Sequence, residues 1–361
     1  MLKVKTKTLQ EMTQKAMKGA SNNKILPLTS MLAIELKTNV LTLTTTDFSN
    51  YLEIKQDKVE GEDFYVVVQA DIFSKLIGKL STEEVTLTVE GNVLTVKANG
   101  TYKLELPADE DGSLVQFPEY KKNLDATTTF IKLATLKSIL TTNKASVAQD
   151  MVVPALTGYY IDANGVLTSD SFVACHNKVT GLNDSFMLPC QVVELFNVLD
   201  QEDVSVTVGE TDVVFNTNGA TIYGKLLMEK DNFPVEAISN YLKTSFDSKC
   251  KLPKDALLSV LDRMILFVGN YDKNEVYLTF TTDGITFESR KGTGKELVKY
   301  GESENFKPFT CCIDIEILKA QIQAQQTEVI DLYYGNPGAI KLASDAIVQI
   351  VSLSEDDRVG A

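Results

Sequence analysis

The sequence has no tryptophan, one histidine (His176) and five scattered cysteines without a CxxC pair. One imidazole and isolated thiols provide no ligand pattern for structural zinc, and the odd cysteine count predicts free thiols in a reducing compartment. No apolar run reaches the roughly 18 residues needed to span a bilayer, and the segment from Met1 to Lys5 lacks the apolar core of a secretory signal. We therefore expect a cytoplasmic protein without a metal, a cofactor or a membrane span.

Catalytic patterns are also missing. His176 would be the only general base of its type, and no Ser/His/Asp or Cys/His arrangement is legible from the spacing. The segment Gly292-Thr-Gly294-Lys295 lacks the spacing of a phosphate-binding loop. Acidic groups such as Asp109–Asp111 and Asp356-Asp357 lie in expected turns or in the tail, where solvation is their usual role. The sequence predicts a protein that is not an enzyme and has no catalytic residues.

Positive charge is in the minority. The chain has 35 Lys and Arg against 49 Asp and Glu, a net charge of −14. Such a balance argues against holding nucleic acid by bulk attraction, because phosphates repel an acidic surface. It leaves open a protein whose basic residues gather on one face, or one held on DNA by its shape.

A long internal repeat organises the sequence. Shifted back by 119 positions, Cys190–Gly219 aligns without a gap on Asp71–Gly100, and both copies end in Asn-Gly. Each copy reads as an amphipathic helix, an acidic turn and two strands, and Phe117-Pro118 or Phe233-Pro234 follows it. A period near 120 residues is the size of a domain rather than of a solenoid repeat. We expect three domains, at residues 1–122, 123–245 and 246–361.

Hydrophobic periodicity predicts the elements of these domains, and the third copy keeps the order of elements with weaker identity. Helices are expected at residues 9–18, 129–140, from 253, and 314–324. Strand pairs are expected at residues 31–36 with 40–45, 51–56 with 63–68, 157–161 with 165–169, and 275–280 with 284–289, followed by strands at 329–334 and 339–351. Residues 119–125 and 239–251 read as polar linkers. The fold class is α+β, with about two helices and eight strands per domain and sheets able to join edge to edge.

Several cations fall in or beside the expected helices. Two readings of this pattern stay open: a solvated helix surface, or a helix-lined channel that holds duplex DNA by its phosphates without reading sequence. The cations are Lys15, Lys18, Lys75, Lys79, Lys132, Lys137, Arg263 and Lys319.

Four local patterns, in order and at matching spacing, resemble one known family. They are Leu106-Pro107 with Phe117-Pro118, Ser146–Asp150 followed by Leu156-Thr-Gly158, Gly165–Asp170, and Ile265–Phe280 with Gly269-Asn270. Over its whole length the chain is similar to the bacterial DNA polymerase sliding clamp, the beta subunit of the polymerase III holoenzyme. The resemblance implies a head-to-tail homodimer that forms a six-domain ring around duplex DNA, with twelve helices lining the hole. It also implies opening by an ATP-driven clamp loader and tethering of the replicative DNA polymerase.

The resemblance further implies a pocket for short motifs of polymerases and other clamp-binding proteins. Its residues here would be Leu156, Ser169, Ser171, Phe172, Val173, Ala174, Val348 and Ile350. The chain departs from the family at this place, because Ser171-Phe172-Val173 replaces Gly-His-Arg and residues 352–361 replace the usual C-terminus. Phe172 and Val173 could instead be simple strand core. The departure suggests a divergent clamp, such as a phage, plasmid or paralogous copy.

Two further sets of residues follow from the resemblance. Tyr102 and Leu104 would meet Phe267 and Val268 of the second copy at the dimer contact, and Lys24 and Gln149 would lie on loops that touch DNA. The rival to a clamp is an oligomeric scaffold that uses the same repeated fold without DNA.

Overall fold

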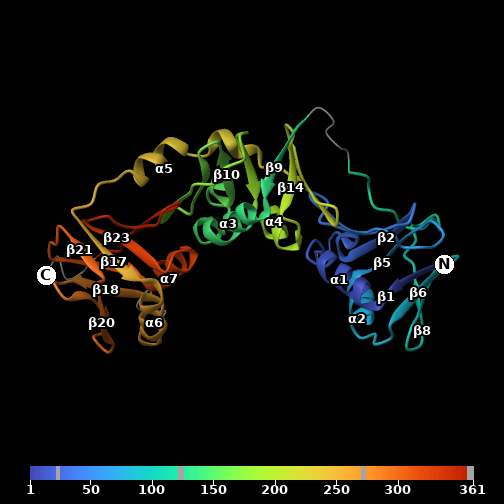
Figure 1. The fold of residues 1–361 in the computed structure, drawn as a ribbon, viewed down its shortest axis with the longest axis horizontal. Helices are drawn as coiled ribbons and strands as arrows, with labels where there is room; N and C mark the ends of the chain where they lie inside the picture. The colour runs from blue at the N-terminus through green and yellow to red at the C-terminus, as the bar shows by residue number, and fades with distance from the viewer. Residues whose placement is uncertain (22–24, 121–125, 270–273, 356–361) are drawn as a thin grey trace. The chain divides into compact units, whose positions relative to one another are not determined.

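A computed structural model describes residues 1–21, 25–120, 126–269 and 274–355 (Figure 1). The same order of elements occurs three times along the chain. The first stretch contains β1 (Leu2–Lys5), α1 (Thr6–Ala16), β2 (Met31–Lys37), β3 (Val40–Thr46), β4 (Tyr51–Gln56), β5 (Phe64–Gln69), α2 (Ala70–Gly78), β6 (Glu84–Glu90), β7 (Val93–Lys97) and β8 (Thr101–Glu105).

The second and third stretches repeat this order, with a short extra strand, β21, in the third. The second contains β9 (Thr127–Lys132), α3 (Leu133–Asn143), β10 (Gly158–Asp162), β11 (Gly165–Ser169), β12 (Val173–Asn177), β13 (Phe186–Pro189), α4 (Cys190–Glu194), β14 (Asp203–Val208), β15 (Asp212–Asn216) and β16 (Ala220–Lys225). After α5 (Val235–Leu242), the third contains β17 (Ser248–Pro253), α6 (Lys254–Met264), β18 (Glu275–Phe280), β19 (Gly284–Ser289), β20 (Lys295–Lys299), β21 (Glu302–Glu304), β22 (Phe309–Asp314), α7 (Ile315–Ala324), β23 (Val329–Asn336), β24 (Ala339–Ala343) and β25 (Ile347–Ser352). Short 3-10 turns are η1 (Pro27–Ser30), η2 (Lys144–Ser146), η3 (Pro154–Thr157), η4 (Leu195–Val198), η5 (Met228–Asn232) and η6 (Ile265–Phe267).

The repeat seen in the sequence is a repeat of structure. Strands β6 and β7 begin at Glu84 and Val93, and β14 and β15 begin 119 positions later, at Asp203 and Asp212. The same relation reaches the third stretch, where β22 begins at Phe309, 245 positions after the first residue of β5. The expected α+β fold is confirmed, with eight strands in each of the first two copies and nine in the third.

The described chain forms two compact units, residues 1–136 with 191–226, and residues 137–190 with 227–361. The first unit has a four-stranded sheet, β1-β6-β7-β8, and an eight-stranded sheet, β5-β2-β3-β4-β16-β15-β14-β9. The second has a four-stranded sheet, β20-β19-β18-β22, and a nine-stranded sheet, β13-β10-β11-β12-β25-β24-β23-β17-β21. Each large sheet consists of two blocks that join edge to edge, through β4·β16 in one unit and β12·β25 in the other.

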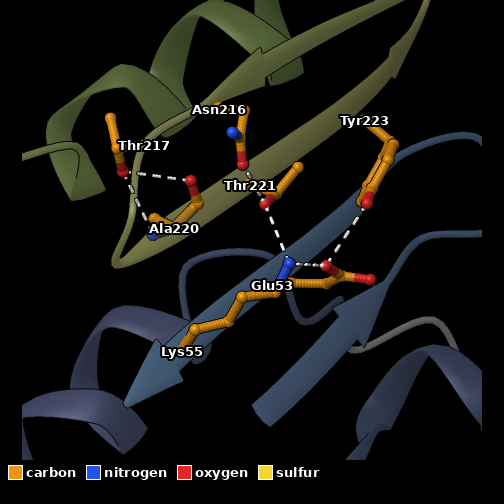
Figure 2. A network of polar contacts seen from close by, with 7 residues as sticks. All are labelled: Glu53, Lys55, Asn216, Thr217, Ala220, Thr221 and Tyr223. Carbon is orange, nitrogen blue, oxygen red and sulfur yellow. Dashed lines mark hydrogen bonds and ion pairs between the residues drawn. The ribbon is translucent and has the colours of Figure 1, made fainter. Parts of the chain in front are cut away.

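A polar network crosses the β4·β16 seam (Figure 2). The Lys55 Nζ lies 2.7 Å from Glu53 Oε2 and donates to Thr221 Oγ1 over 3.2 Å. The Tyr223 hydroxyl donates to the same Glu53 carboxylate over 3.3 Å. Desolvation, followed by the nearby Glu53 charge, raises the pKa of Tyr223, so this phenol remains a donor. These contacts add side-chain specificity to the four backbone-paired positions of the seam.

In each unit a pair of helices packs together on one face of the sheets. In α1 the apolar residues Leu9, Met12 and Ala16 recur at helical spacing and are buried, and the helix packs against α2, β3 and β4. In the second unit, α6 and α7 pack together over a core that includes Leu257 and Leu318. Asp314 caps α7, accepting the backbone N–H groups of the second and third helical residues.

Three sequence-based element assignments are wrong. The helix expected at 129–140 is the strand β9 followed by α3, because a β-branched run (Thr127–Thr129, Ile131) favours extended backbone and pairs with β14. Strands β4 and β5 do not pair with each other, since β2 and β3 lie between them. The single strand expected at 339–351 is the antiparallel pair β24 and β25.

Candidate DNA-facing helices and partner pocket

The described cations singled out in the sequence lie in or beside the helices. Lys132 is the last residue of strand β9 and directly precedes α3. Lys18 and Lys79 lie just beyond the ends of α1 and α2, and Lys137 is an exposed residue of α3. Lys24 lies outside the described residues. Gln149 follows η2, is exposed, and donates its amide to the Val147 carbonyl over 3.1 Å.

Within the first unit, helical cations are paired with carboxylates. The Nζ of Lys15, in the last turn of α1, lies 2.6 Å from Asp200 Oδ2. Lys75 lies one turn after Asp71 in α2, with its Nζ 2.7 Å from Asp71 Oδ2. These ammonium groups therefore do not present an uncompensated positive charge.

Lys132 is paired twice. Its Nζ lies 2.8 Å from Oδ1 of Asp203, the first residue of β14, and 3.0 Å from Oε1 of the preceding Glu202. Hydrogen bonds from the ammonium to Asp203 and then Glu202 raise the pKa of Lys132, so it stays charged. The register of β9 on β14 places Lys132 directly opposite Asp203.

The second unit repeats this arrangement. The Nε of Arg263, in the last turn of α6, donates to Glu296 Oε2 over 3.0 Å, and its Nη2 donates to the second carboxylate oxygen. This fork-like contact with the guanidinium lowers the pKa of Glu296. The Nζ of Lys319 in α7 lies 2.6 Å from Asp262 Oδ1 on α6.

The residues proposed for the partner pocket divide between two faces of the nine-stranded sheet. Ser169, Ala174 and Ile350 lie side by side across three strands and share one face. Val348 shares that face by alternation along β25. Val173 points to the opposite face, where it joins the core under α6 and α7.

Phe172 lies at the turn before β12 and its side chain is 63% exposed, so it is not strand core. Asp170 Oδ1 accepts the backbone N–H groups of Phe172 and Val173, over 2.9 and 2.7 Å. Ser171 is exposed in this turn, with φ 79°, a left-handed conformation that non-glycine residues seldom adopt. The Phe172 carbonyl accepts the N–H of Ser352, which ties the turn to the end of β25.

Helix α5 covers the same face, although the sequence predicts a polar linker from residue 239 onward. It buries Ile238 against Leu156, Ala174 and the preceding Phe233, and the Tyr241 hydroxyl lies 3.0 Å from Ser352 Oγ. A helical spacing of apolar residues from 235 to 242 was the available signal. This face of the sheet is therefore covered by a helix.

A lysine lies beside this face, one strand beyond Ile350. Lys341 pairs across β24·β25 with Ile350, and its Nζ lies 4.2 Å from the ring centre of Tyr333 and 5.2 Å from that of Phe246. Burial lowers the pKa of Lys341, while the faces of the two rings favour its cationic form. Nothing in the sequence pattern distinguished Lys341 from a surface lysine.

A buried amide network lies at the β12·β25 seam. Gln349 Nε2 donates to Gln321 Oε1 over 2.9 Å, and Gln325 Nε2 donates to Gln349 Oε1 over 2.6 Å. Ser146 Oγ donates to the same Gln321 oxygen over 2.9 Å. These side chains are at most 1% exposed, so their hydrogen bonds specify how β25, α7 and η2 pack.

Known proteins with a similar sequence or fold include bacterial sliding clamps. Residues 1–114 match the family model of the DNA polymerase III beta subunit, N-terminal domain. A beta sliding clamp of Halalkalibacterium halodurans is 23% identical over 290 residues, 74% of each chain. The solved beta subunit of Streptococcus pyogenes DNA polymerase superposes with a TM-score of 0.87 at 18% identity, over 98% of this chain and all of that one. The resemblance to sliding clamps is confirmed.

Over nearly its whole length the chain has the fold of the bacterial beta sliding clamps and is similar to them. The Bacillus subtilis sliding clamp gives a TM-score of 0.83 at 18% identity, with 98% of this chain and 99% of that chain covered. A DNA polymerase III subunit beta of Borrelia burgdorferi, solved with a natural product, gives 0.86 at 16% identity, with 98% and 99% covered. Within the described ranges, no helix is long and apolar enough to cross a membrane, and no His, Cys, Asp and Glu group is arranged to hold a metal.

Two strands of this sliding-clamp fold lie at sheet edges next to exposed apolar residues. Tyr102 and Leu104 on the edge strand β8 pair with the buried Val96 and Leu94, so they face the core side of their sheet. Tyr102 is nevertheless 37% exposed. At the other edge strand, β20, Phe267 is 48% exposed and its ring packs over Gly294. Val268 follows, half-buried.

Proposed function

We propose that two copies of this chain close head to tail into a ring that encircles duplex DNA in the cytoplasm. The ring holds the replicative DNA polymerase on its template, is opened by a clamp loader, and docks other proteins that carry a clamp-binding motif. It catalyses no reaction and reads no sequence. Each copy would supply three domains, at 1–122, 123–245 and 246–361, and its helices would face the duplex.

The observation that supports this proposal is a pattern of strand pairing that recurs between successive copies of the repeat. The fourth strand of the first stretch, β4, pairs with the last strand of the second stretch, β16, and the fourth strand of the second stretch, β12, pairs with the last strand of the third, β25. The equivalent strand of the third stretch is β20, and the last strand of the first is β8. Both are edge strands within their sheets. Pairing β20 of one copy with β8 of another, twice, would close a ring and leave neither edge exposed.

The register of this third seam can be derived from equivalent glycines. A Cβ on Gly165 would meet the Asn177 carbonyl, and a Cβ on Gly284 would meet the Val298 carbonyl. Asn177 therefore corresponds to Val298.

Counting back along β12 and β20 makes Val173 correspond to Gly294. On the partner strand, Leu104 corresponds to Val351, because each pairs with the equivalent buried residue of its hairpin. Val173 pairs with Val351, so Leu104 would lie opposite Gly294.

This register brings Leu104 against the ring of Phe267, which packs over Gly294. The register of the β4·β16 seam differs by two residues and would bring Tyr102 to the same place. Either way an apolar residue of β8, the half-buried Leu104 or the exposed Tyr102, covers Phe267. The contact would bury side chains that are unusually exposed for their size in a single copy.

The partner pocket is proposed at Leu156, Ala174 and α5, with Ile350 and Val348 beside it. Its floor is apolar and Lys341 lies at one side, so it fits a short peptide with apolar anchors. Ser171 and Phe172 form an exposed rim. Because Val173 faces the core, we assign it a role in packing rather than in peptide contact.

Topological retention on DNA tests the proposal. The chain is diluted to dissociate dimers, mixed with nicked circular DNA and concentrated, and then passed through a sizing column at high salt. A closed ring stays with the circular DNA and leaves after the circle is cut once. Binding by charge alone is lost at high salt whether or not the circle is cut. An oligomeric scaffold that does not use DNA would leave the circle before cutting, which would contradict the proposal.

A further inference from the structure

Five of the cations assigned to the DNA-facing surface are already neutralised within the chain. Their ammonium or guanidinium groups contact six carboxylates. The pairs are Lys15 with Asp200, Lys75 with Asp71, Lys132 with Glu202 and Asp203, Arg263 with Glu296, and Lys319 with Asp262. Among the residues that the structure describes, Lys18, Lys79 and Lys137 have no ion pair within 4.0 Å.

The pairing recurs at equivalent places of the repeat. Lys15 and Arg263 are each the last but one residue of an 11-residue helix, α1 and α6. Each is held by a carboxylate from outside its own helix, Asp200 or Glu296. If the charges on these helices were placed at random, a carboxylate partner would not be expected for the cation at the same position of both α1 and α6.

These pairs contribute little to stability, because at least one side chain of each is more than half exposed and such pairs are screened by water and salt. Their effect on a nearby polyanion is larger. A lysine that holds a carboxylate presents a dipole instead of a positive charge, and Lys132 with two carboxylates presents a net negative charge. The force on a phosphate therefore falls, and no counterion is released from the DNA at such a site.

We propose that Asp200, Asp262 and the Glu202–Asp203 pair limit how strongly the ring grips DNA. Together with Asp71 and Glu296, they leave only Lys18, Lys79 and Lys137 unpaired among the described cations assigned to the helices, so the duplex is retained by closure of the ring and can slide with little electrostatic drag. This inference rests on the proposed function, since it assumes that the helices face the duplex. It adds residues whose role is to weaken a contact rather than to make one.

Salt dependence measures the number of effective cations directly. The slope of log K against log salt is about −0.9 per phosphate neutralised on duplex DNA. For a short linear duplex, which no ring can trap, we expect a shallow slope for the natural chain. Freeing Lys15 and Lys319 in Asp200→Asn/Asp262→Asn should steepen it by up to about 2 per chain.

A matched control removes two carboxylates from the opposite face of a sheet. Lys249 and Lys251 lie on β17, on the face away from the buried Cys250, and their Nζ atoms lie 2.8 and 2.6 Å from Asp331 and Glu302. Glu302→Gln/Asp331→Asn therefore changes the net charge by the same amount and also frees two lysines. We expect its slope to equal that of the natural chain.

An equal change of the salt slope in both double variants would overturn the inference, because it would be an effect of net charge alone. An unchanged salt slope in the helix variant, Asp200→Asn/Asp262→Asn, would overturn it as well. If the helix variant does not fold, Asp71→Asn on the exposed surface of α2 replaces it, with an expected change of about 1. Failure of this inference can be distinguished from failure of the clamp proposal. Retention on circles with equal slopes would refute only this inference, whereas a steeper slope without retention would refute only the ring.

Discussion

The buried amide network at the β12·β25 seam gives the sharpest stability prediction. Replacing Gln349 with Leu keeps its approximate volume but removes both of its hydrogen bonds. Gln321 Oε1 keeps the Ser146 hydroxyl as a donor. Gln325 loses the acceptor of its Nε2, and its Oε1 already has no partner in the described part of the chain. A buried amide without partners costs about 1–3 kcal/mol, and each lost bond about 1 more.

We therefore expect Gln349→Leu to lower the free energy of unfolding by about 2–4 kcal/mol. In a unit of this size that corresponds to a fall in Tm of roughly 5–12 °C. The measurement is thermal and urea unfolding followed by circular dichroism. Because two compact units need not unfold together, the shift is read from whichever transition moves.

A control variant and a double variant test whether the effect comes from the amide network. Gln323→Leu, on an exposed position of the same helix α7, should change stability by less than about 0.5 kcal/mol. Adding Gln325→Leu to Gln349→Leu removes the stranded amide, so the double variant should be less destabilised than the sum of the singles. If Gln349→Leu behaves like Gln323→Leu, or if the two changes simply add, the network does not determine packing at this seam.

Three further predictions concern other parts of the fold. Leu104→Lys should shift the chain toward monomers in sedimentation, because it places a charge against Phe267 of the second copy, while Lys103→Ala on the same strand should not; equal behaviour would argue against this register. Ile238→Ala should cost roughly 2–5 kcal/mol in urea unfolding, and a loss under 0.5 kcal/mol would show that α5 is not anchored to the pocket face. Burial raises the pKa of Cys175 to about 12, so at pH 8 it stays a neutral thiol and should react with a disulfide reagent only on unfolding, after the half-buried Cys190; rapid native labelling of Cys175 would contradict this.

The repeat was the most predictable feature of the chain. Because β6–β7 and β14–β15 keep both their turns and their apolar alternation, a gapless 119-residue shift showed two of the three copies. Strand pairing was less predictable. The sequence placed β4 beside β5 as neighbours in the chain, whereas β4 pairs with β3 and with β16, about 170 residues away. Local patterns report alternation and turns, but not which distant edge a strand meets.

The candidate site shows the same contrast between local features, which the sequence predicts, and distant partners, which it does not. Helical spacing identified Lys15, Lys75 and Lys319 as surface cations, but their carboxylate partners come from positions that no spacing rule connects, such as Asp200. The apolar run of α5 was hidden by the polar residues around it. Val173 was assigned to the pocket by family position, while strand alternation from Ala174 alone would have placed it on the other face.

Solution mass, measured by light scattering together with negative-stain imaging, tests the central claim most directly. We predict a particle of twice 39.8 kDa with a central hole, held by two β8·β20 seams. A compact monomer at micromolar concentration would leave the fold intact and contradict the claim that this chain closes around DNA.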